Sequence, residues 1–377
     1  MNRKQIIKLI LFSIGIKVLY FIFSTSLISS DESVYTQYIQ LVKKNDSFWY
    51  EKIARNGYRE IRVKEEIGFS EAEKYTQSEW AFFPFYSYLN RYTSKIFGLS
   101  LDLSSLIWSV LFSTLAIIGV YWFGILFLHD ERCAFFCTLV LFSFPFSFYY
   151  SMFYTEALFL TLVIFCLIAV YFRQYFLLAL LLIPLSLLRP NGIIMVLPLY
   201  IFHLEKTGLL NKFHLKWKGL TSKENIVRST SFVVAPIVFG LFCWYQYVKT
   251  GFYFAFSIAQ AGWYREFMFP VLSFFRRGDF ATQFNSIYTL LVIAYAILIR
   301  KKLPLSLNIF VLISLVLPLF SGSVTSMPRF ISTIFPLFLV LGAQIFRLTT
   351  KWLIYIIIAI LHFVSLFWWI SGHPISF

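Results

Sequence analysis

Charged side chains are scarce in this sequence of 377 residues. Asp, Glu, Lys and Arg make up 14% of it, whereas hydrophobic residues make up 59%, and the mean hydropathy is +0.73. A soluble globular chain carries about 25% charged residues. The scarcity of charge therefore excludes an ordinary soluble domain and predicts an integral membrane protein with lipid as its solvent.

Motifs for nucleic acids, metals and nucleotides are also missing. The formal net charge is +15, but the chain has no zinc-finger spacing, no glycine-rich phosphate loop and no basic helix with polar faces. The basic residues instead lie between apolar runs, as expected for the connections between the spans of a membrane protein. We therefore expect no nucleic-acid partner, no metal and no other cofactor.

Cysteine is equally scarce, with Cys133, Cys137, Cys166 and Cys243 in or beside apolar segments. The first two are one helical turn apart, which suits a metal pair, but buried thiols far more commonly act as small hydrophobes. We expect neither a disulfide nor a cysteine-bound metal.

Long apolar runs dominate what is present. A membrane span needs about 20 apolar residues, and the sequence predicts eleven candidate helices, near 6–27, 104–128, 133–150, 156–172, 175–188, 191–204, 230–248, 283–299, 303–320, 330–346 and 351–371. The first run lacks a small-residue cleavage site, so we interpret it as a retained span. The pieces from 156 to 204 are short and interrupted by proline, and such broken helices often border cavities. The predicted fold is an all-α polytopic membrane protein with one domain over 1–377.

Lys and Arg in the short connections predict the orientation. Arg3, Lys4 and Lys8 place the N-terminus in the cytoplasm. Alternation of the spans then places further bases on the same side, in a basic loop at 205–229 and at Arg132, Arg173, Arg300, Lys301, Lys302, Arg347 and Lys351. Two long exterior loops remain, at 28–103 and 249–282, and the C-terminus is exterior. We expect the first loop to contain short amphipathic helices at the membrane interface.

Ionisable residues near the membrane fall on one side of this topology. Asp46, Glu156, Arg189, Arg265 and Arg329 all map to the outer ends of spans or to outer loops. Such residues are costly at membrane depth and usually functional. Their distribution predicts an outward-facing polar site roofed by the first loop and suited to an anionic lipid and a sugar.

Each of these features also has a purely structural interpretation. Asp46 precedes a helical stretch and is either an N-cap or a general base. Glu156 begins a span, where the helix N-terminus favours a carboxylate and Thr155 is a candidate cap. Arg189 either marks the interface or holds a phosphate with its paired donors. The aromatic segment 80–86 favours an aromatic belt at the interface.

The order of the short motifs resembles that of the PIG-V family of GPI mannosyltransferases and its prokaryotic relatives. The motifs that carry the resemblance are Asp46 with Phe48-Trp49-Tyr50, Ile53-Ala54, Gly57-Tyr58, Phe82-Phe83-Pro84, Tyr154-Thr155-Glu156, Arg189-Pro190-Asn191-Gly192, Gln260 with Trp263 and Arg265, and Pro328-Arg329-Phe330 with Pro336. No single motif is specific, but the ordered set covers most of the chain. Many members have a Trp-Asp pair just ahead of Trp-Tyr, whereas here Asn45 precedes Asp46 and Ser47-Phe48 intervene.

The resemblance implies a GT-C-type membrane glycosyltransferase. Such an enzyme moves a sugar, here mannose, from a polyprenyl-phosphate donor to a hydroxyl of a glycan, lipid or protein on the exterior or lumenal face. Asp46 would be the base of an inverting reaction, and arginines would stabilise the departing phosphate. The residues expected to bind donor and acceptor are Trp49, Tyr50, Tyr58, Tyr154, Glu156, Arg189, Asn191, Gln260, Trp263, Arg265 and Arg329. The expected location is the plasma membrane of a prokaryote or the endoplasmic reticulum of a eukaryote, with a small membrane subunit as a candidate partner.

Two other classes of protein remain open at this point. Broken helices and internal charges also fit a transporter or flippase of a lipid-linked sugar or other anionic lipid. An accessory membrane subunit would have no chemistry of its own. The lack of an internal repeat and the collection of polar residues at one face favour the transferase. Loss of Asp46 separates these classes, because only a transferase needs its carboxylate for chemistry.

Overall fold

The protein is built almost entirely of helices. The computed structural model describes residues 2–27, 33–71, 74–211, 214–276 and 278–376, and the chain is 77% helical, so the predicted all-α class is confirmed. Within those ranges the strands form two antiparallel hairpins, β1 (Phe69–Glu71) with β2 (Lys74–Thr76) and β3 (Leu210–Asn211) with β4 (His214–Leu215). The hairpins were not predicted, because strands of two or three residues are too short to show an alternating pattern.

Among the described residues, five helices are long and apolar enough to cross a membrane. They are α1 (Arg3–Leu27), α6 (Leu101–Leu128), α13 (Lys223–Thr250), α15 (Phe280–Ile299) and α19 (Lys351–Ile370). A helix rises 1.5 Å per residue, so about 20 residues match a hydrocarbon core of about 30 Å. The structure thus supports an integral membrane protein.

The other predicted spans are shorter helices that lie between these five. Eleven complete spans are therefore not confirmed, because a 12-residue helix covers only about 18 Å. The shorter helices are α7 (Glu131–Phe142), α8 (Glu156–Tyr171), α9 (Tyr175–Ser186), α10 (Pro190–Ile194), α11 (Val196–Lys206), α16 (Leu305–Leu319), α17 (Met327–Ser332) and α18 (Phe335–Phe346). Prolines coincide with several of the breaks: Pro184 lies inside α9, and Pro190 begins α10. The predicted interruption between 156 and 204 is confirmed.

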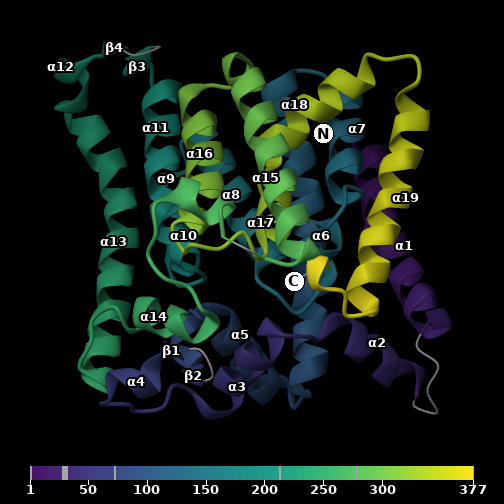
Figure 1. Cartoon of the computed structure of the whole chain (residues 1–377). Coiled ribbons are helices and arrows are strands. Elements are labelled where there is room, and N and C mark those ends of the chain that lie inside the picture. Colours follow the sequence, from purple (N-terminus) through teal and green to yellow (C-terminus); the bar gives the residue numbers. More distant parts are fainter. Residues whose placement is uncertain (1, 28–32, 72–73, 212–213, 277, 377) are drawn as a thin grey trace.

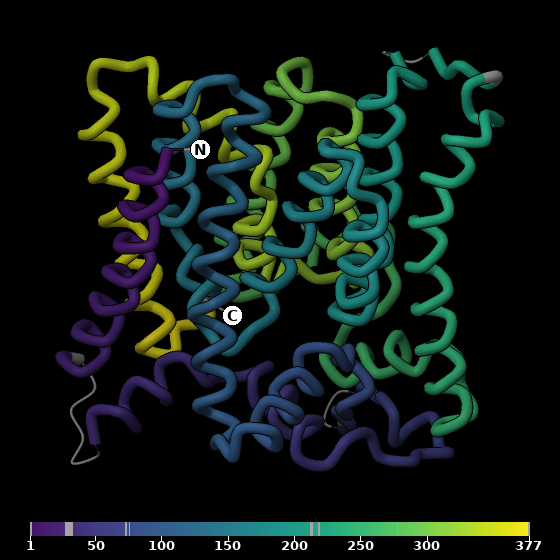
Figure 2. The backbone as a smooth tube through the Cα atoms, turned by 180° about the vertical axis from the view of Figure 1, so that it is seen from behind, coloured from purple at the N-terminus to yellow at the C-terminus, as the bar shows by residue number. Residues whose placement is uncertain are grey.

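The bundle has two different ends (Figure 1). One end, here called the loop end, carries α2 (Val34–Val42), α3 (Asp46–Asn56), α4 (Lys64–Ile67), α5 (Pro84–Phe97) and α14 (Ala255–Ile258). The other, here called the basic end, carries β3, β4 and α12 (Trp217–Leu220). The view from behind shows the start of α1 near the basic end and the short helices of the first loop lying across the loop end (Figure 2). The short helices expected in the first loop are present.

The two long loops pack against each other at the loop end. A Cβ on Gly262 would lie 2.3 Å from the carbonyl oxygen of Thr76, and one on Gly68 would lie 2.4 Å from that of Ile258. These two positions need glycine because any side chain would push the loop backbones apart.

The aromatic segment 80–86 does not form a belt at the membrane interface. Trp80 is 0% exposed, and Phe83 and Tyr86 are 2% exposed. Phe83 packs on Phe242 of α13, and Tyr86 packs edge-on against Tyr50 of α3. The belt interpretation is wrong because these rings turn inward and join the first loop to the bundle.

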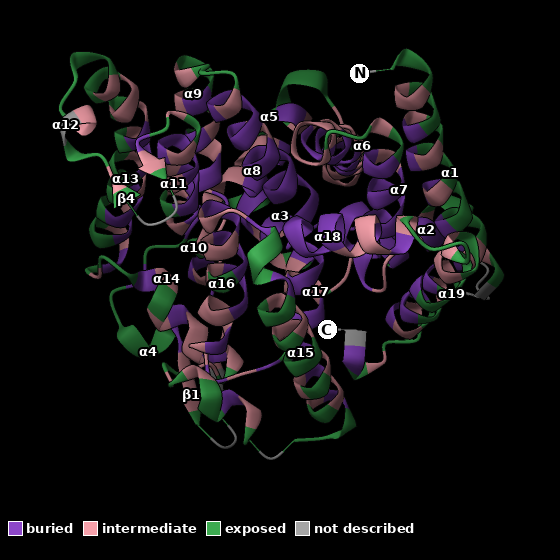
Figure 3. Ribbon diagram, turned by 90° about the horizontal axis from the view of Figure 1, so that it is seen from above, coloured by how far each residue is buried: buried purple, intermediate pink, exposed green. Residues whose placement is uncertain are grey.

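Burial separates the interior helices from the peripheral ones. Buried residues gather in α6, α7, α8 and α18, whereas α1, α13, α15 and α19 show many exposed residues (Figure 3). The exposed residues include large apolar side chains such as Trp244, Leu291 and Ile360. Contiguous exposed apolar surface of this kind is typical of helices that face lipid. The four cysteines are buried and their thiols are free.

Candidate functional site

The carboxylate of Asp46 lies at the start of α3 and forms an ion pair. Asp46 is the first residue of the helix; Asn45 occupies the N-cap position with φ 50° and makes no side-chain cap hydrogen bond. Asn tolerates this left-handed conformation better than most residues. The N-cap interpretation of Asp46 is therefore wrong, because its Oδ2 instead accepts a hydrogen bond of 2.7 Å from Nη1 of Arg329.

Arg329 also faces Glu156, which pairs with a second arginine. The Oε1 atom of Glu156 lies 3.4 Å from Nε of Arg329 and 3.1 Å from Nη2 of Arg189. The side chain of Glu156 is 2% exposed, those of both arginines are 11% exposed, and that of Asp46 is 25% exposed. These four residues, here called the charge cluster, come from α3, α8, α17 and the residue before α10. Arg189 and Arg329 therefore lie close together, because both contact the same oxygen of Glu156.

Local backbone features hold the charge cluster in place. Thr155 occupies the N-cap position of α8 without a cap hydrogen bond, so its predicted capping role is wrong. Its hydroxyl instead accepts a hydrogen bond from Arg189 and lies 3.4 Å from the hydroxyl of Tyr50. The backbone of Arg189 is extended, and Pro190 starts the short helix α10. A Cβ on Gly192 would lie 2.0 Å from the carbonyl oxygen of Leu185, so glycine lets α10 fold closely against α9.

Aromatic rings surround the two guanidinium groups. The guanidinium of Arg329 lies 5.2 Å from the ring centre of Tyr154 and 5.7 Å from that of Tyr149, and Arg189 lies 4.9 Å from that of Phe159. Cation–π contacts of this length favour the charged form and fix its orientation. Tyr149 and Phe159 were missed by the sequence analysis, because nothing in their spacing distinguishes them in a chain that is 21% aromatic.

Three further rings form an aromatic shelf from separate segments. Trp49 stacks on Phe82 with 5.9 Å between ring centres, and Trp263 lies edge-on to both, at 5.5 Å and 5.6 Å. All three are half-buried, and Nζ of Lys52 lies 4.6 Å from the ring centre of Trp49. The shelf unites motifs from α3, the first loop and the second loop.

Arg265 lies within electrostatic reach of the charge cluster. Burial lowers the pKa of its guanidinium, the nearby Asp46 raises this pKa, and Arg329 lowers it. Its Nη1 donates a hydrogen bond of 2.9 Å to Oε1 of Gln260, so these two predicted residues act as a unit. Three arginines and two carboxylates leave the site with excess positive charge.

Several buried polar atoms at the site lack a hydrogen bond within the described chain. They are Oε2 of Glu156 and Nε of Arg329, although the latter lies 3.4 Å from Oε1 of Glu156, and Oδ1 of Asn191 on α10 is in the same position. Buried polar groups are nearly always hydrogen-bonded, to protein, water, an ion or a ligand. These atoms are therefore candidates to bind a water molecule or a polar group of a substrate.

Not every predicted residue enters the site. The hydroxyl of Tyr58 donates to the carbonyl of Phe82 at 2.6 Å, and its ring stacks on buried Trp80. Tyr58 therefore supports the loop backbone. The hydroxyl of Tyr154 donates to the carbonyl of Lys44 at 2.9 Å, which leaves its ring facing Arg329.

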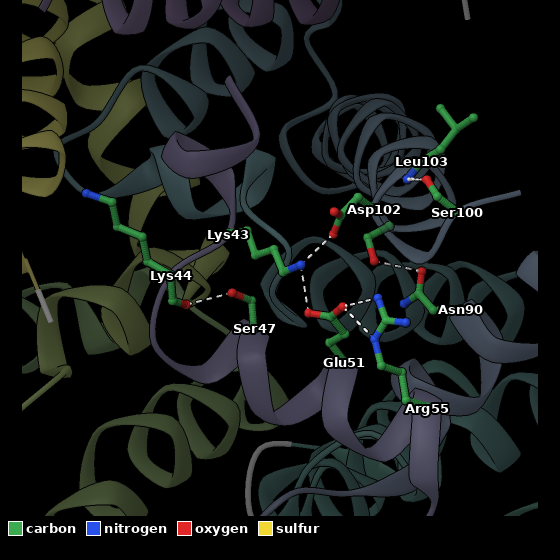
Figure 4. A network of polar contacts seen from close by, with 10 residues as sticks. Lys43, Lys44, Ser47, Glu51, Arg55, Asn90, Ser100, Asp102 and Leu103 are labelled. Carbon is green, nitrogen blue, oxygen red and sulfur yellow. Dashed lines mark hydrogen bonds and ion pairs between the residues drawn. The ribbon is translucent and has the colours of Figure 1, made fainter. Parts of the chain in front are cut away.

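A neighbouring network anchors α3 to the bundle (Figure 4). The Nζ atom of Lys43 bridges Glu51 and Asp102 at 2.7 Å each, and Arg55 pairs with the same Glu51. Burial raises the pKa of Glu51, but the hydrogen bonds from Lys43 and Arg55 outweigh this and hold the pKa below its usual range. Glu51 thus forms ion pairs with two bases, Lys43 and Arg55, whereas Asp46 forms one among the described residues, with Arg329. Asp46 is therefore the carboxylate of α3 that is more available to a substrate.

No protein-family model and no curated protein matches this chain. The resemblance to the PIG-V family therefore stays a prediction. The function of the site must be inferred from its geometry.

Proposed function

We propose that the protein is a membrane transferase whose reaction takes place at the loop end, on a substrate with an anionic lipid phosphate. More particularly, we propose a glycosyltransferase that uses a polyprenyl-phosphate sugar, with mannose as the first sugar to test. The observation that carries the proposal is the charge cluster, in which one partly exposed carboxylate lies beside buried, aromatic-lined arginines. The loop end would face the exterior or the lumen.

Asp46 would serve as the general base in this reaction. One of its oxygens is bonded to Arg329, and among the described residues no donor occupies the other oxygen, Oδ1. A base must lie within hydrogen-bond reach of the proton that it takes. The acceptor hydroxyl would lose its proton to Asp46 while its oxygen bonds to the anomeric carbon of the sugar.

The arginines would stabilise the leaving group. As the new bond forms, the bond between the anomeric carbon and the phosphate oxygen breaks, and its electron pair leaves on the polyprenyl phosphate. Arg189 and Arg329 offer paired donors to phosphate oxygens, and Nε of Arg329 has no hydrogen-bond acceptor within the described chain. Attack from the face opposite the phosphate would invert the anomeric carbon. The aromatic shelf would contact the sugar.

Substitution of Asp46 by Asn tests this proposal. The variant keeps the size of the side chain and its ability to accept from Arg329, but it cannot take a proton. Transfer of radiolabelled mannose from polyprenyl phosphate, measured in membranes that overexpress the protein, should fall by a factor on the order of 10²–10⁴. A panel of other polyprenyl-phosphate sugars extends the assay if mannose is not the donor.

Asp279→Asn is the matched control. Asp279 is a true N-cap at the start of α15, where its carboxylate accepts from the amide of Thr282 at 2.9 Å. Asn caps a helix about as well as Asp, so this variant should retain transfer. Transfer by Asp46→Asn at the control's level, with equal protein in the membrane, would contradict the assignment of the base. Absence of transfer by the native protein from every donor would contradict the proposed function and favour a flippase or an accessory subunit.

A further inference from the structure

A cavity of about 1200 Å³ lies at the basic end, opposite to the charge cluster. Its walls come from α6, α8, α11, α15 and α16, all of which are labelled in Figure 1. The lining is mainly apolar and includes Phe123, Phe202, Val311 and Leu315. Apolar lining of this extent suits hydrocarbon chains rather than a soluble metabolite.

The mouth of this cavity carries three bases that form no ion pair among the described residues. Lys206 ends α11, and Arg300 and Lys301 follow α15. Among the described residues, no acidic side chain forms an ion pair with these three bases. Lys206 instead lies 4.3 Å from the ring centre of Tyr171. The mouth therefore attracts an anion.

The one acidic residue in the lining is already occupied. The carboxylate of Glu205 accepts hydrogen bonds from the backbone amide and the hydroxyl of Ser306, at 3.2 Å and 2.5 Å. It thereby satisfies a free donor at the start of α16, where the helix dipole favours negative charge. Glu205 is thus hydrogen-bonded to α16 and forms no ion pair with Lys206, on which its charge acts only through space.

The cavity is as deep as one leaflet and opens sideways. Along α16 its lining runs from Leu305 to Val316, which at 1.5 Å per residue is about 16 Å. Half of a hydrocarbon core of about 30 Å is nearly the same length. Two lining residues, Ile297 on α15 and Leu312 on α16, are 54% and 59% exposed. The wall between α15 and α16 therefore gives access to the membrane.

We propose that this cavity binds an anionic glycerophospholipid from the leaflet at the basic end. Its phosphate lies between Lys206, Arg300 and Lys301, and an acyl chain runs along α16 towards Leu315. Charge complementarity at the mouth selects an anionic headgroup, and the depth matches a chain confined to one leaflet. The proposal does not depend on the transferase activity, since the charge cluster lies at the other end.

The bound lipid also completes the packing of α15. Of the 20 residues of α15, only Ala281, Asn285, Thr289 and Ile299 are buried. A ligand that binds the folded state alone stabilises that state by RT ln(1 + L/Kd), where L is the free ligand concentration. Occupancy of the cavity therefore raises thermal stability.

The test uses the full-length protein purified in a neutral detergent. Phosphatidylglycerol should raise the unfolding temperature and remain bound in native mass spectrometry, whereas phosphatidylcholine of the same chain length should do neither. The triple variant K206Q/R300Q/K301Q should retain at least about tenfold less phosphatidylglycerol, because each base near a membrane surface strengthens binding to anionic lipid. Leu312→Trp, at the side opening, should also reduce retention while leaving all three bases in place.

A matched triple variant, K4Q/K216Q/K223Q, removes three exposed bases from the same end but outside the cavity. It should bind phosphatidylglycerol like the native protein. Equal loss in both triple variants would overturn the proposal, since attraction to the charged surface would then explain the binding. Equal retention of phosphatidylcholine, a preference for polyprenyl phosphate, or a full stability shift from inorganic phosphate alone would each overturn the stated ligand.

Discussion

The charge cluster at the loop end and the mouth of the cavity at the basic end differ in how their charges are paired. In the charge cluster, acids and bases form ion pairs that are largely buried, and Glu156 pairs with both Arg189 and Arg329. At the cavity, none of the bases Lys206, Arg300 and Lys301 forms an ion pair with an acidic side chain of the described residues. Buried charges need partners because desolvation is costly, whereas bases at a membrane surface find theirs in lipid headgroups. The comparison indicates a reaction site at one end and a lipid-facing surface at the other.

The largest expected effect concerns the sides of the membrane on which the two ends lie. After replacement of the four native cysteines by serine, a cysteine at Arg62 of the loop end should react with an impermeant thiol reagent added outside intact cells. A cysteine at Lys216 of the basic end should react only after the membrane is permeabilised. Both native side chains are exposed. External labelling of a cysteine at position 216 would show that the basic end faces the exterior, which contradicts the predicted topology.

Substitution of one glutamate at each end compares how much the two ends contribute to the free energy of unfolding. Glu156→Gln leaves two largely buried arginines without their shared carboxylate, and removal of one partner from a buried ion pair destabilises by about 3–5 kcal/mol. Glu205→Gln should cost about 1 kcal/mol, because glutamine still accepts a hydrogen bond from Ser306. Denaturant unfolding in detergent gives both values. Similar losses in the two variants would show that the loop-end pairs are not specially stabilising.

Arginine identity should matter at the loop end and not at the basic end. Arg329→Lys keeps the charge but loses the planar fork that contacts Asp46 and Glu156. It should lower donor affinity in the transfer assay by about tenfold or more. Arg347→Lys, at an exposed position near the basic end, should transfer normally. Normal donor affinity in both Arg329→Lys and Arg189→Lys would favour a purely structural role for these arginines.

Acid should destabilise the segment 59–80 of the loop end, by less than the Glu156→Gln substitution does. Glu79 is buried, and although burial raises its pKa, hydrogen bonds from Arg59 and the backbone hold that pKa below its ordinary value of 4.5. A carboxylate whose pKa is lower in the folded state contributes stability above the unfolded pKa and loses it as pH falls through the folded pKa. We expect a loss on the order of 1–2 kcal/mol, visible as smaller hydrogen-exchange protection factors in 59–80 below about pH 4, with each observed rate compared with the intrinsic rate at the same pH.

Glu79→Gln provides the control for this acid effect. The variant should show smaller protection factors already at pH 7, because Arg59 loses its carboxylate partner, and these factors should change little further in acid. Protection factors in 59–80 of the native protein that do not change with pH would contradict the role given to this ion pair.

Much of the fold and part of the candidate site could be predicted from single residues and their order. Apolar runs located the helices, and prolines located the breaks, because both act over a few neighbouring residues. The Lys and Arg residues of the short connections predicted that the 205–229 loop and the N-terminal end of α1 lie on the same side of the membrane. The cap alternatives considered for Asp46 and Thr155 are wrong, because each side chain instead bonds to an arginine that local sequence does not reveal. The buried aromatics at 80–86 were misplaced for the same reason.

The sequence by itself determined the class of fold, the grouping of basic segments and the types of residue at the candidate site. Local propensity and hydrophobicity are enough for these, since they depend on the residues themselves. The tertiary structure alone decided that Asp46 pairs with Arg329, that Glu156 is shared by two arginines, and that Glu205 bonds to Ser306. Those contacts join residues between 33 and 283 positions apart in the sequence. They form only when packing brings the helices together.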